Sequence, residues 1–428
     1  MTQNENITIV GAGLVGCLLS LYMARRGCRV NMYDRRSDLR KNYLEYGRSI
    51  NLALSDRGWQ ALDGIGIGDA IRQVGIPMYG RMMHNPQGKL SFQPYGKEGQ
   101  AIYSVSRGGL NVAMLDLADA HPNVTIHFEQ QCLGVDLPTN TLDFQDHAGG
   151  ERVQVPAERI LACDGAFSMV RNSMQKTDRY EYSQSYLEYG YKELSIAAAP
   201  DGGWVFEKHA LHIWPRGQYM MIALPNRDGS FTCTLFLPFE GPSSFASLTS
   251  EEALQRFFGE VFPDALPLMP HLARDYLRNP TGSLVTIRCF PWAWQDKILL
   301  FGDASHAIVP FYGQGMNAGF EDCTVFDQLL EQHGFAWPTV FDLYQRPRKP
   351  TTDAMAALAV QHFIEMRDLV ADPRFLLRKK IESRIHAQYP DEWTPLYSMV
   401  TFSHAPYAEA LAAGKRHDEI MENVMPHV

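Results

Sequence analysis

The sequence lacks several features that would mark a secreted or membrane protein. None of its seven cysteines forms a CxxC pair, and most lie in apolar strand-like runs, which favours reduced core residues in a cytoplasmic protein. No apolar run reaches the roughly 18 residues that a membrane-spanning helix needs. The first strand-like run begins within a few residues of Met1, so neither a signal peptide nor a membrane anchor is expected.

The chain also lacks a basic block. Its 39 lysines and arginines are outnumbered by 48 acidic residues, for a formal net charge of −9, which argues against nucleic acid as a partner. With 428 residues, of which 45% are hydrophobic, the chain is long enough for two or three domains with a large core.

A glycine-rich fingerprint opens the chain. Ile7–Val10 predicts a buried strand, Gly11 a tight turn, Gly13 a close approach of a pyrophosphate, and Gly16 close packing of the next helix. A second strand ends at Asp34, whose carboxylate can accept hydrogen bonds from an adenosine ribose. Strand, helix, strand and acid in this order predict a dinucleotide site.

The rest of the chain predicts an α/β fold: a Rossmann-like nucleotide-binding domain with an inserted antiparallel β-sheet domain and a helical C-terminal region. Alternating runs between residues 186 and 237, and a hairpin around Asn85-Pro86-Gln87-Gly88, indicate the inserted sheet. The chain becomes mostly helical beyond Pro350. The expected boundaries are 1–75, 100–180 and 285–345 for the nucleotide domain, 76–99 and 181–284 for the sheet domain, and 346–428 for the helical region.

Two more motifs follow the first. One is a strand running into Asp164-Gly165, with Ser168 and Arg171 downstream; the other is Gly302-Asp303, followed by a glycine-rich helix start at 313–319. An Asp-Gly pair alone is usually a surface turn. The three motifs in this order resemble the single-component flavin aromatic hydroxylases across essentially the whole chain.

The resemblance implies a bound FAD and a transient NADPH. It implies that Asp303 binds the ribityl chain and that the helix N-terminus at 313–317 lies under the isoalloxazine, where positive potential favours the anionic reduced flavin. Asp164 and Arg171 fall in the segment that the family uses for both FAD and NADPH. The further implied cofactor contacts are Ala53, Arg107, Gly313, Gln314, Gly315, Met316 and Asn317.

Longer segments are similar to the kynurenine 3-monooxygenase family. They cover 47–55, 106–111, 311–319, 365–367 and 395–400. The similarity implies hydroxylation of L-kynurenine with NADPH and O2 through a flavin C4a-hydroperoxide. No protein nucleophile is then required, because the cofactor carries the chemistry.

Substrate residues are expected on the hairpin and in the helical region. Arg81 alone would be interpreted as a solvated strand residue, but the resemblance makes it the clamp for the substrate carboxylate. Tyr95 and Tyr397 are its implied partners. The other implied substrate contacts are Phe311, Tyr312 and His362.

Two departures from the family leave alternatives open. His362 stands where the family usually has Asn, and Tyr312 stands where relatives often carry Phe or His. A hydroxylase acting on another aromatic acid therefore remains an alternative, as does a flavin-binding sensor without turnover. His306, beside the flavin loop, is interpreted as a hydrogen-bonded structural histidine rather than a general base.

Overall fold

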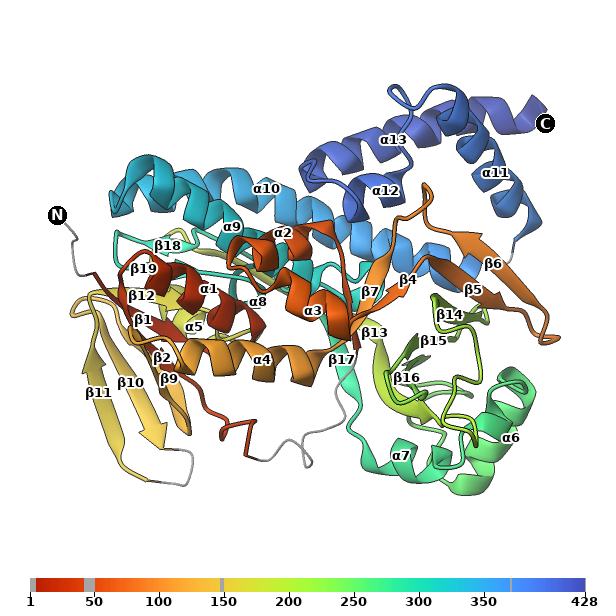
Figure 1. The fold of residues 1–428 in the computed structure, drawn as a ribbon, viewed down its shortest axis with the longest axis horizontal. Helices are drawn as coiled ribbons and strands as arrows, with labels where there is room; N and C mark the ends of the chain where they lie inside the picture. The colour runs from red at the N-terminus through yellow and green to blue at the C-terminus, as the bar shows by residue number, and fades with distance from the viewer. Residues whose placement is uncertain (1–4, 42–50, 147–149, 370–371, 428) are drawn as a thin grey trace.

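The computed structural model describes residues 5–41, 51–146, 150–369 and 372–427. Figure 1 shows a nucleotide-binding region on the left, a second sheet at the lower right and C-terminal helices at the upper right. The long helix α10 runs along the top of both regions. The mixed α/β class predicted from the sequence is confirmed.

The six-stranded sheet on the left is the Rossmann-like core. Its neighbouring strands are parallel, except for the pair β18 and β19. Residues Ile7–Val10 of its central strand are all buried, as expected for a parallel strand covered on both faces. In spatial order the strands are β18 (Ala293–Trp294), β19 (Ile298–Leu300), β12 (Arg159–Ala162), β1 (Asn6–Val10), β2 (Arg29–Tyr33) and β8 (Val124–His127).

Helices pack around this sheet. The first of them ends before Gly27, which adopts φ +86°, the left-handed conformation that glycine supplies at helix ends. Ser106 caps α4, and its side chain accepts a hydrogen bond from the Gly109 amide. The helices are α1 (Leu14–Arg25), α2 (Asp56–Gly64), α3 (Gly68–Val74), α4 (Arg107–Asp119), α5 (Met169–Met174), α8 (Asp303–His306) and α9 (Gly315–His333).

The second large sheet confirms the strands expected between residues 186 and 237, within observed strands that span 181–238, and the hairpin around residues 85–88. It differs from a purely antiparallel sheet in one pairing, because β14 lies parallel to β5, which comes from much earlier in the chain. The order is β17 (Gly282–Phe290), β13 (Glu181–Ile196), β16 (Phe231–Pro238), β15 (Met220–Pro225), β14 (Ala210–Pro215), β5 (Gly80–His84) and β6 (Leu90–Pro94). Helices α6 (Glu251–Val261) and α7 (Leu272–Arg278) and the 3-10 turn η1 (Leu266–Leu268) accompany this sheet.

Two small sheets complete the strands. One consists of β3 (Asn51–Leu54), β7 (Ile102–Ser106) and β4 (Ile76–Met78), and its strand β3 contacts Asn317 at the start of α9. The other, β9 (Gln130–Asp136), β10 (Thr141–Asp146) and β11 (Arg152–Pro156), was not predicted from the sequence. Its outer strand β11 is largely exposed, so little of its pattern reports a buried face.

The C-terminal region is helical, as expected, but its first helix begins earlier. Helix α10 starts at Trp337 and contains Pro347 and Pro350. Proline removes a backbone donor from a helix, yet buried residues on both sides, among them Tyr344 and Arg348, hold this one in place. The remaining elements are η2 (Pro310–Tyr312), the π-helical turn η3 (Glu365–Leu369), α11 (Pro373–Gln388), α12 (Leu396–Thr401), α13 (Tyr407–Val424) and η4 (Met425–His427).

Among the described residues, no helix is long and apolar enough to cross a membrane. The domain boundaries expected from the sequence stay a prediction.

Candidate active site

The first glycine fingerprint forms a cradle in which Gly11 and Gly16 have no room for side chains. Gly11 has φ +102°, and a Cβ there would lie 2.4 Å from the Cys163 carbonyl oxygen. A Cβ on Gly16 would lie 1.9 Å from the Gly11 carbonyl oxygen. A Cβ added at Gly13, by contrast, would meet nothing within 4 Å. No side chain caps the N-terminus of α1, which follows Gly13. The open N-terminus of α1 therefore suits a pyrophosphate.

Asp34 lies at the end of β2, as predicted, but its carboxylate is already well bonded. It accepts a hydrogen bond from the Ala12 amide at 2.7 Å and others from the backbone and guanidinium of Arg36. Burial opposes ionisation, yet the Arg36 contacts and the Ala12 amide lower the pKa of Asp34. The carboxylate thus ties the glycine turn to β2, and its contact with a ribose stays a prediction.

The flavin loop, residues 313–317, leads into the N-terminus of α9. Gly313 adopts φ +68°, and α9 begins two residues later. The Asn317 side chain donates to the Ala53 carbonyl at 2.9 Å and accepts from the Ser55 amide. The Gln314 side chain donates to the Ser55 hydroxyl. These side chains hold the loop against β3, so backbone amides, including those of Gly315 and Met316, remain to face a ligand.

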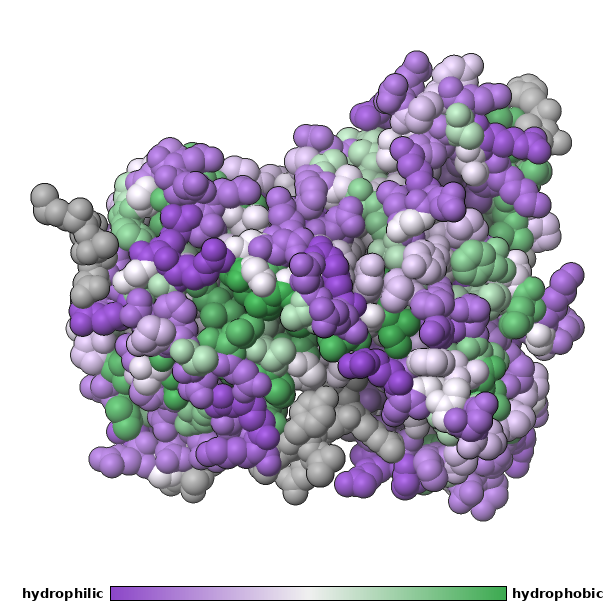
Figure 2. Space-filling model, in the orientation of Figure 1, coloured by the Kyte–Doolittle hydropathy of each residue, from purple (hydrophilic) through white to green (hydrophobic). Residues whose placement is uncertain are grey.

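Four other expected cofactor residues fall into two groups. Asp303 and Arg107 are exposed at the starts of α8 and α4. In Figure 2, the surface over α1 and α8, which Figure 1 labels in the same orientation, is largely hydrophobic. Asp164 and Arg171 instead have internal partners. One oxygen of Asp164 accepts from the Met169 amide, while Arg171 is 1% exposed and donates to the carbonyls of Ala304 and Ala166.

Asp164 retains one feature that favours a ligand. Its Oδ1 atom is buried with no hydrogen-bond partner among the described residues, and burial raises the pKa of the carboxyl. Arg171, which spans between the Asp-Gly segment and α8, positions the backbone at Ala304. Direct cofactor contacts of both residues stay predictions.

A buried ionic network behind the flavin loop was missed from the sequence. Asp322 accepts hydrogen bonds from the Arg348 guanidinium, from His306 Nε2 at 2.7 Å and from the Gly302 amide at 3.0 Å. Glu321 pairs with both Arg348 and Arg57. His306 is thereby the hydrogen-bonded structural residue expected for it. The adjacent acids in a helix were the available signal, but sequence alone favours solvent for such charges.

The expected substrate residues come together around Arg81. Its guanidinium lies 3.0 Å from His362 Nε2, and its Cζ atom lies 4.6 Å from the ring centre of Tyr397 and 5.5 Å from that of Tyr95. Because Arg81 can only donate, His362 accepts with Nε2 and carries its proton on Nδ1. Burial lowers the pKa of His362, which agrees with a neutral ring.

Two polar atoms in this cluster are buried without a hydrogen-bond partner among the described residues, Nε of Arg81 and the hydroxyl of Tyr95. No carboxylate of the described residues forms an ion pair with Arg81. Burial raises the pKa of Tyr95 well above its ordinary value, so the hydroxyl remains a donor. A buried cation and buried donors without acceptors suit an anionic ligand.

Aromatic side chains form a wall beside the cluster. Tyr312 lies 4.3 Å from the His362 ring and 5.6 Å from the Tyr397 ring, between ring centres. Phe311 stacks on Phe363 at 4.1 Å. Tyr312 and Phe311 immediately precede the flavin loop, so one short segment serves both parts of the site.

Glu365 belongs to the cluster but had been given no role. Its carboxylate lies 3.9 Å from His362 Nδ1. Burial opposes ionisation, yet the neighbouring His362 ring and the nearby Lys379 cation hold the pKa of Glu365 at about 2. An ionised acid therefore stands behind His362, one helical turn along the chain.

Comparison with known proteins agrees with this geometry. Residues 4–359 match the family model described as "FAD binding domain". A curated kynurenine 3-monooxygenase from Flavobacterium johnsoniae is 51% identical over 425 residues, covering 99% of this chain and 95% of that protein. The chain belongs to the kynurenine 3-monooxygenase family.

Relatives in this family extend well beyond one bacterial group. The kynurenine 3-monooxygenase of Myxococcus xanthus is 49% identical, covering 99% of this chain and 91% of that protein. That of Dictyostelium discoideum is 44% identical, covering 99% and 93%.

Solved structures show the same fold at low identity. A tetrameric 2-methyl-3-hydroxypyridine-5-carboxylic acid oxygenase has a TM-score of 0.71 at 20% identity, covering 87% of this chain and 95% of that chain. A p-nitrophenol 4-monooxygenase from Pseudomonas putida has a TM-score of 0.69 at 17% identity, covering 96% and 98%.

FAD is the cofactor of this family member, and the residues present fit it. The cradle at Gly11, Gly13 and Gly16, the exposed Asp303 and Arg107, and the orphaned Asp164 oxygen provide the glycine turn, polar groups and space that the group needs. Residues 47–50, part of the segment similar to the kynurenine 3-monooxygenase family, lie outside the described residues.

Proposed function

We propose that this protein hydroxylates L-kynurenine to 3-hydroxykynurenine, using bound FAD and consuming NADPH and O2. The observation that carries the proposal is Arg81, a partly buried cation that has no ion-paired carboxylate among the described residues and is enclosed by Tyr95, Tyr397 and His362 next to the flavin loop. Curated relatives named kynurenine 3-monooxygenase support the substrate.

The two charged groups of the substrate fit the two charges of the cluster. Arg81 offers parallel donors to the α-carboxylate, and the Tyr95 hydroxyl adds a third. The ionised Glu365 suits the α-ammonium group, since opposite charges stabilise each other in a partly desolvated site. His362 lies between Arg81 and Glu365: its Nε2 accepts from Arg81, and its Nδ1 lies 3.9 Å from the Glu365 carboxylate.

The aromatic wall positions the substrate ring. Phe311 and Tyr312 are 7% exposed, so the ring of the substrate would enter a largely apolar space beside the flavin loop. FAD, when bound, supplies the hydride acceptance and oxygen activation of the reaction. The residues of the chain orient the ring carbon next to the amino group and exclude water, since productive orientation and a dry site limit side reactions.

We further propose a cytoplasmic location and the three-part division given above. All seven cysteines are free in the structure, as expected in a reducing compartment. The candidate site draws on all three parts: Arg81 and Tyr95 come from the sheet domain, Phe311 and Tyr312 from the nucleotide domain, and His362, Glu365 and Tyr397 from the helical region.

The test is aerobic NADPH oxidation by the FAD-loaded protein with and without L-kynurenine, with the product mass recorded. Stimulated oxidation and a product one oxygen heavier would support the proposal. NADPH loss that yields only hydrogen peroxide would make kynurenine an effector instead of a substrate. FAD binding without stimulation by L-kynurenine would favour another aromatic acid as the substrate, and FAD binding without stimulation by any such acid would favour a flavin-binding sensor.

A second candidate substrate class is another aromatic acid. It is favoured by His362, whose ring contacts both Arg81 and Tyr312 where the family usually has Asn. Comparing L-kynurenine with anthranilate and phenolic acids as stimulators of NADPH oxidation separates the two candidates.

A further inference from the structure

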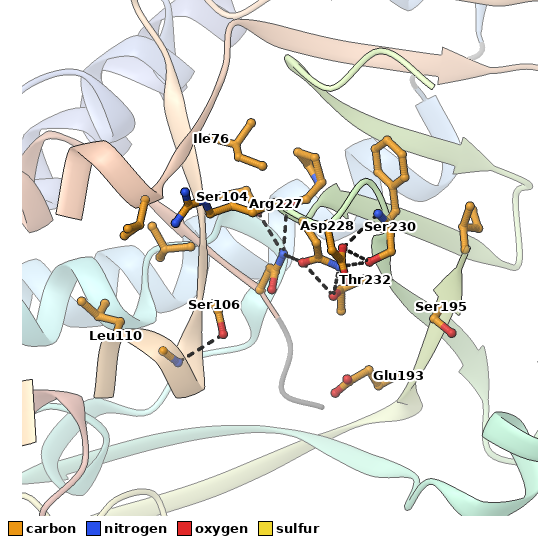
Figure 3. A pocket seen from close by; sticks show the side chains of 18 of the residues that line it. Ile76, Ser104, Ser106, Leu110, Glu193, Ser195, Arg227, Asp228, Ser230 and Thr232 are labelled. Atoms are coloured by element: carbon orange, nitrogen blue, oxygen red, sulfur yellow. Dashed lines mark hydrogen bonds between the residues drawn. The ribbon is translucent and has the colours of Figure 1, made fainter. Parts of the chain in front are cut away.

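A large cleft lies apart from the Arg81 cluster. Its volume is about 820 Å³, and it runs between α3, α4 and β7 on one side and β13 and β16 on the other. Figure 3 shows Ser106 and Leu110 on one wall and Glu193 and Ser195 on the opposite wall. No residue of the proposed substrate cluster lines it, so the hydroxylation site leaves the cleft unexplained.

Amides and hydroxyls form the polar floor of this cleft. The Asn51 side chain donates to Asn226 at 2.6 Å and to Ser104 at 3.1 Å. Asn226 in turn donates to the hydroxyls of Ser230 and Thr232. These neutral groups bind one another, and the donors and acceptors that they have left over suit a carboxamide and ribose hydroxyls.

A smaller cavity of about 330 Å³ adjoins the cleft, and both are lined by Val74, Ile76 and Arg227. Its described lining holds no carboxylate but includes two cations, Arg227 and Lys208. The Lys208 ammonium lies 4.7 Å from the centre of the Trp204 ring. Two positive charges beside an indole favour a phosphate next to a flat heterocycle.

The charges orient a ligand that spans both cavities. Glu193 and Asp228 line only the large cleft, so a phosphate is favoured at the small cavity and a neutral group in the cleft. Strand β3 joins the lining of the cleft to the flavin loop. Asn51 lines the cleft, and Ala53, two residues on, accepts the hydrogen bond from Asn317.

We propose that these joined cavities bind NADPH. The adenosine 2′-phosphate lies at Lys208 and Arg227, and the nicotinamide riboside lies in the large cleft against Asn51 and Asn226. The proposal rests on the proposed function for its need of NADPH. It supplies a site that a single glycine fingerprint cannot, because α1 already serves FAD.

The test is the double variant Lys208→Gln/Arg227→Gln of the FAD-loaded protein. We expect its dissociation constant for NADPH, measured by anaerobic flavin reduction, to rise about tenfold or more, as for loss of charge-assisted phosphate contacts. The dissociation constant for NADH, which lacks the 2′-phosphate, should stay within about twofold. Adenosine 2′,5′-bisphosphate should compete with NADPH in the wild type and lose affinity in the variant.

The matched control is Lys89→Gln/Arg152→Gln, which removes the same charge from exposed positions outside both cavities. It should bind NADPH as the wild type does. The proposal is overturned if the cavity variant keeps wild-type NADPH affinity, if it loses NADPH and NADH equally, or if the control weakens NADPH as strongly.

The two proposals fail in different ways. If the wild type hydroxylates kynurenine and the cavity variant binds NADPH unchanged, only the proposed NADPH site is contradicted. If the cavity variant selectively loses NADPH binding but the wild type does not respond to kynurenine, the NADPH site is supported and the proposed substrate is contradicted.

Discussion

Two arginine clusters adjoin the segment around the flavin loop, and they differ in whether their charge is neutralised. Arg348 and Arg57 meet Glu321 and Asp322, and nearly every donor has an acceptor. Arg81 contacts aromatic rings and a neutral histidine, and in the part of the chain that the structure describes it has no ion-paired carboxylate. The first arrangement is complete within the chain, whereas the second is completed by a ligand, and this difference separates a structural charge from a binding charge.

The largest expected effect comes from breaking the complete cluster. Asp322→Asn should lower the free energy of unfolding by about 3–5 kcal/mol, since it leaves buried cations unpaired. Urea unfolding measures the change. The control Asp327→Asn removes a partly exposed pair with Arg26 and should cost no more than about 1 kcal/mol. Equal losses in both variants would contradict the distinction.

The incomplete cluster should respond in activity and not in stability. Arg81→Met should lower kcat/KM for L-kynurenine about 100-fold, because a desolvated carboxylate loses its charge partner. The free energy of unfolding should change by less than about 1 kcal/mol, because no folded-state ion pair is lost. Steady-state kinetics and urea unfolding of the same variant measure both quantities. A variant that unfolds easily but keeps its kcat/KM would place Arg81 with the structural charges.

Acid should weaken the complete cluster in a defined window. Burial opposes the ionisation of Asp322, but His306 and Arg348 lower the pKa of its carboxyl from 3.8 to about 2. A carboxylate with a lowered folded pKa stabilises the fold above its ordinary pKa, and that stability is lost as pH falls through the folded value. The difference in unfolding free energy between wild type and Asp322→Asn should shrink by about 2 kcal/mol between pH 4 and pH 2. A difference independent of pH would contradict this.

The smallest expected effect tests one unpartnered hydroxyl. Tyr95→Phe should raise KM for L-kynurenine about fivefold, equivalent to about 1 kcal/mol for one hydrogen bond, without loss of stability. Tyr344→Phe removes another buried hydroxyl that has no hydrogen-bond partner among the described residues, but away from the Arg81 cluster. It should leave KM unchanged, and a similar change in both variants would speak against a substrate contact by Tyr95.

Parts of the fold could be read from local sequence because their geometry is local. The turn at Gly11, the end of α1 at Gly27 and the hairpin at 80–94 each depend on residues within a few positions of one another. The parallel pairing of β14 with β5 could not be read in this way, since it joins segments about 130 residues apart and no spacing encodes it.

The candidate site divides along the same line. Sequence by itself determined the backbone cradle for a dinucleotide, because glycine positions impose close approach and φ values wherever the chain folds. It also indicated Arg81, Tyr95, Tyr397 and His362, but only through resemblance. Tertiary structure alone decided that His362 is neutral, that Glu365 stands behind it and that Asp322 neutralises Arg348. The physical reason is that the state of a charge depends on its neighbours in space, and burial brings those neighbours from distant parts of the chain.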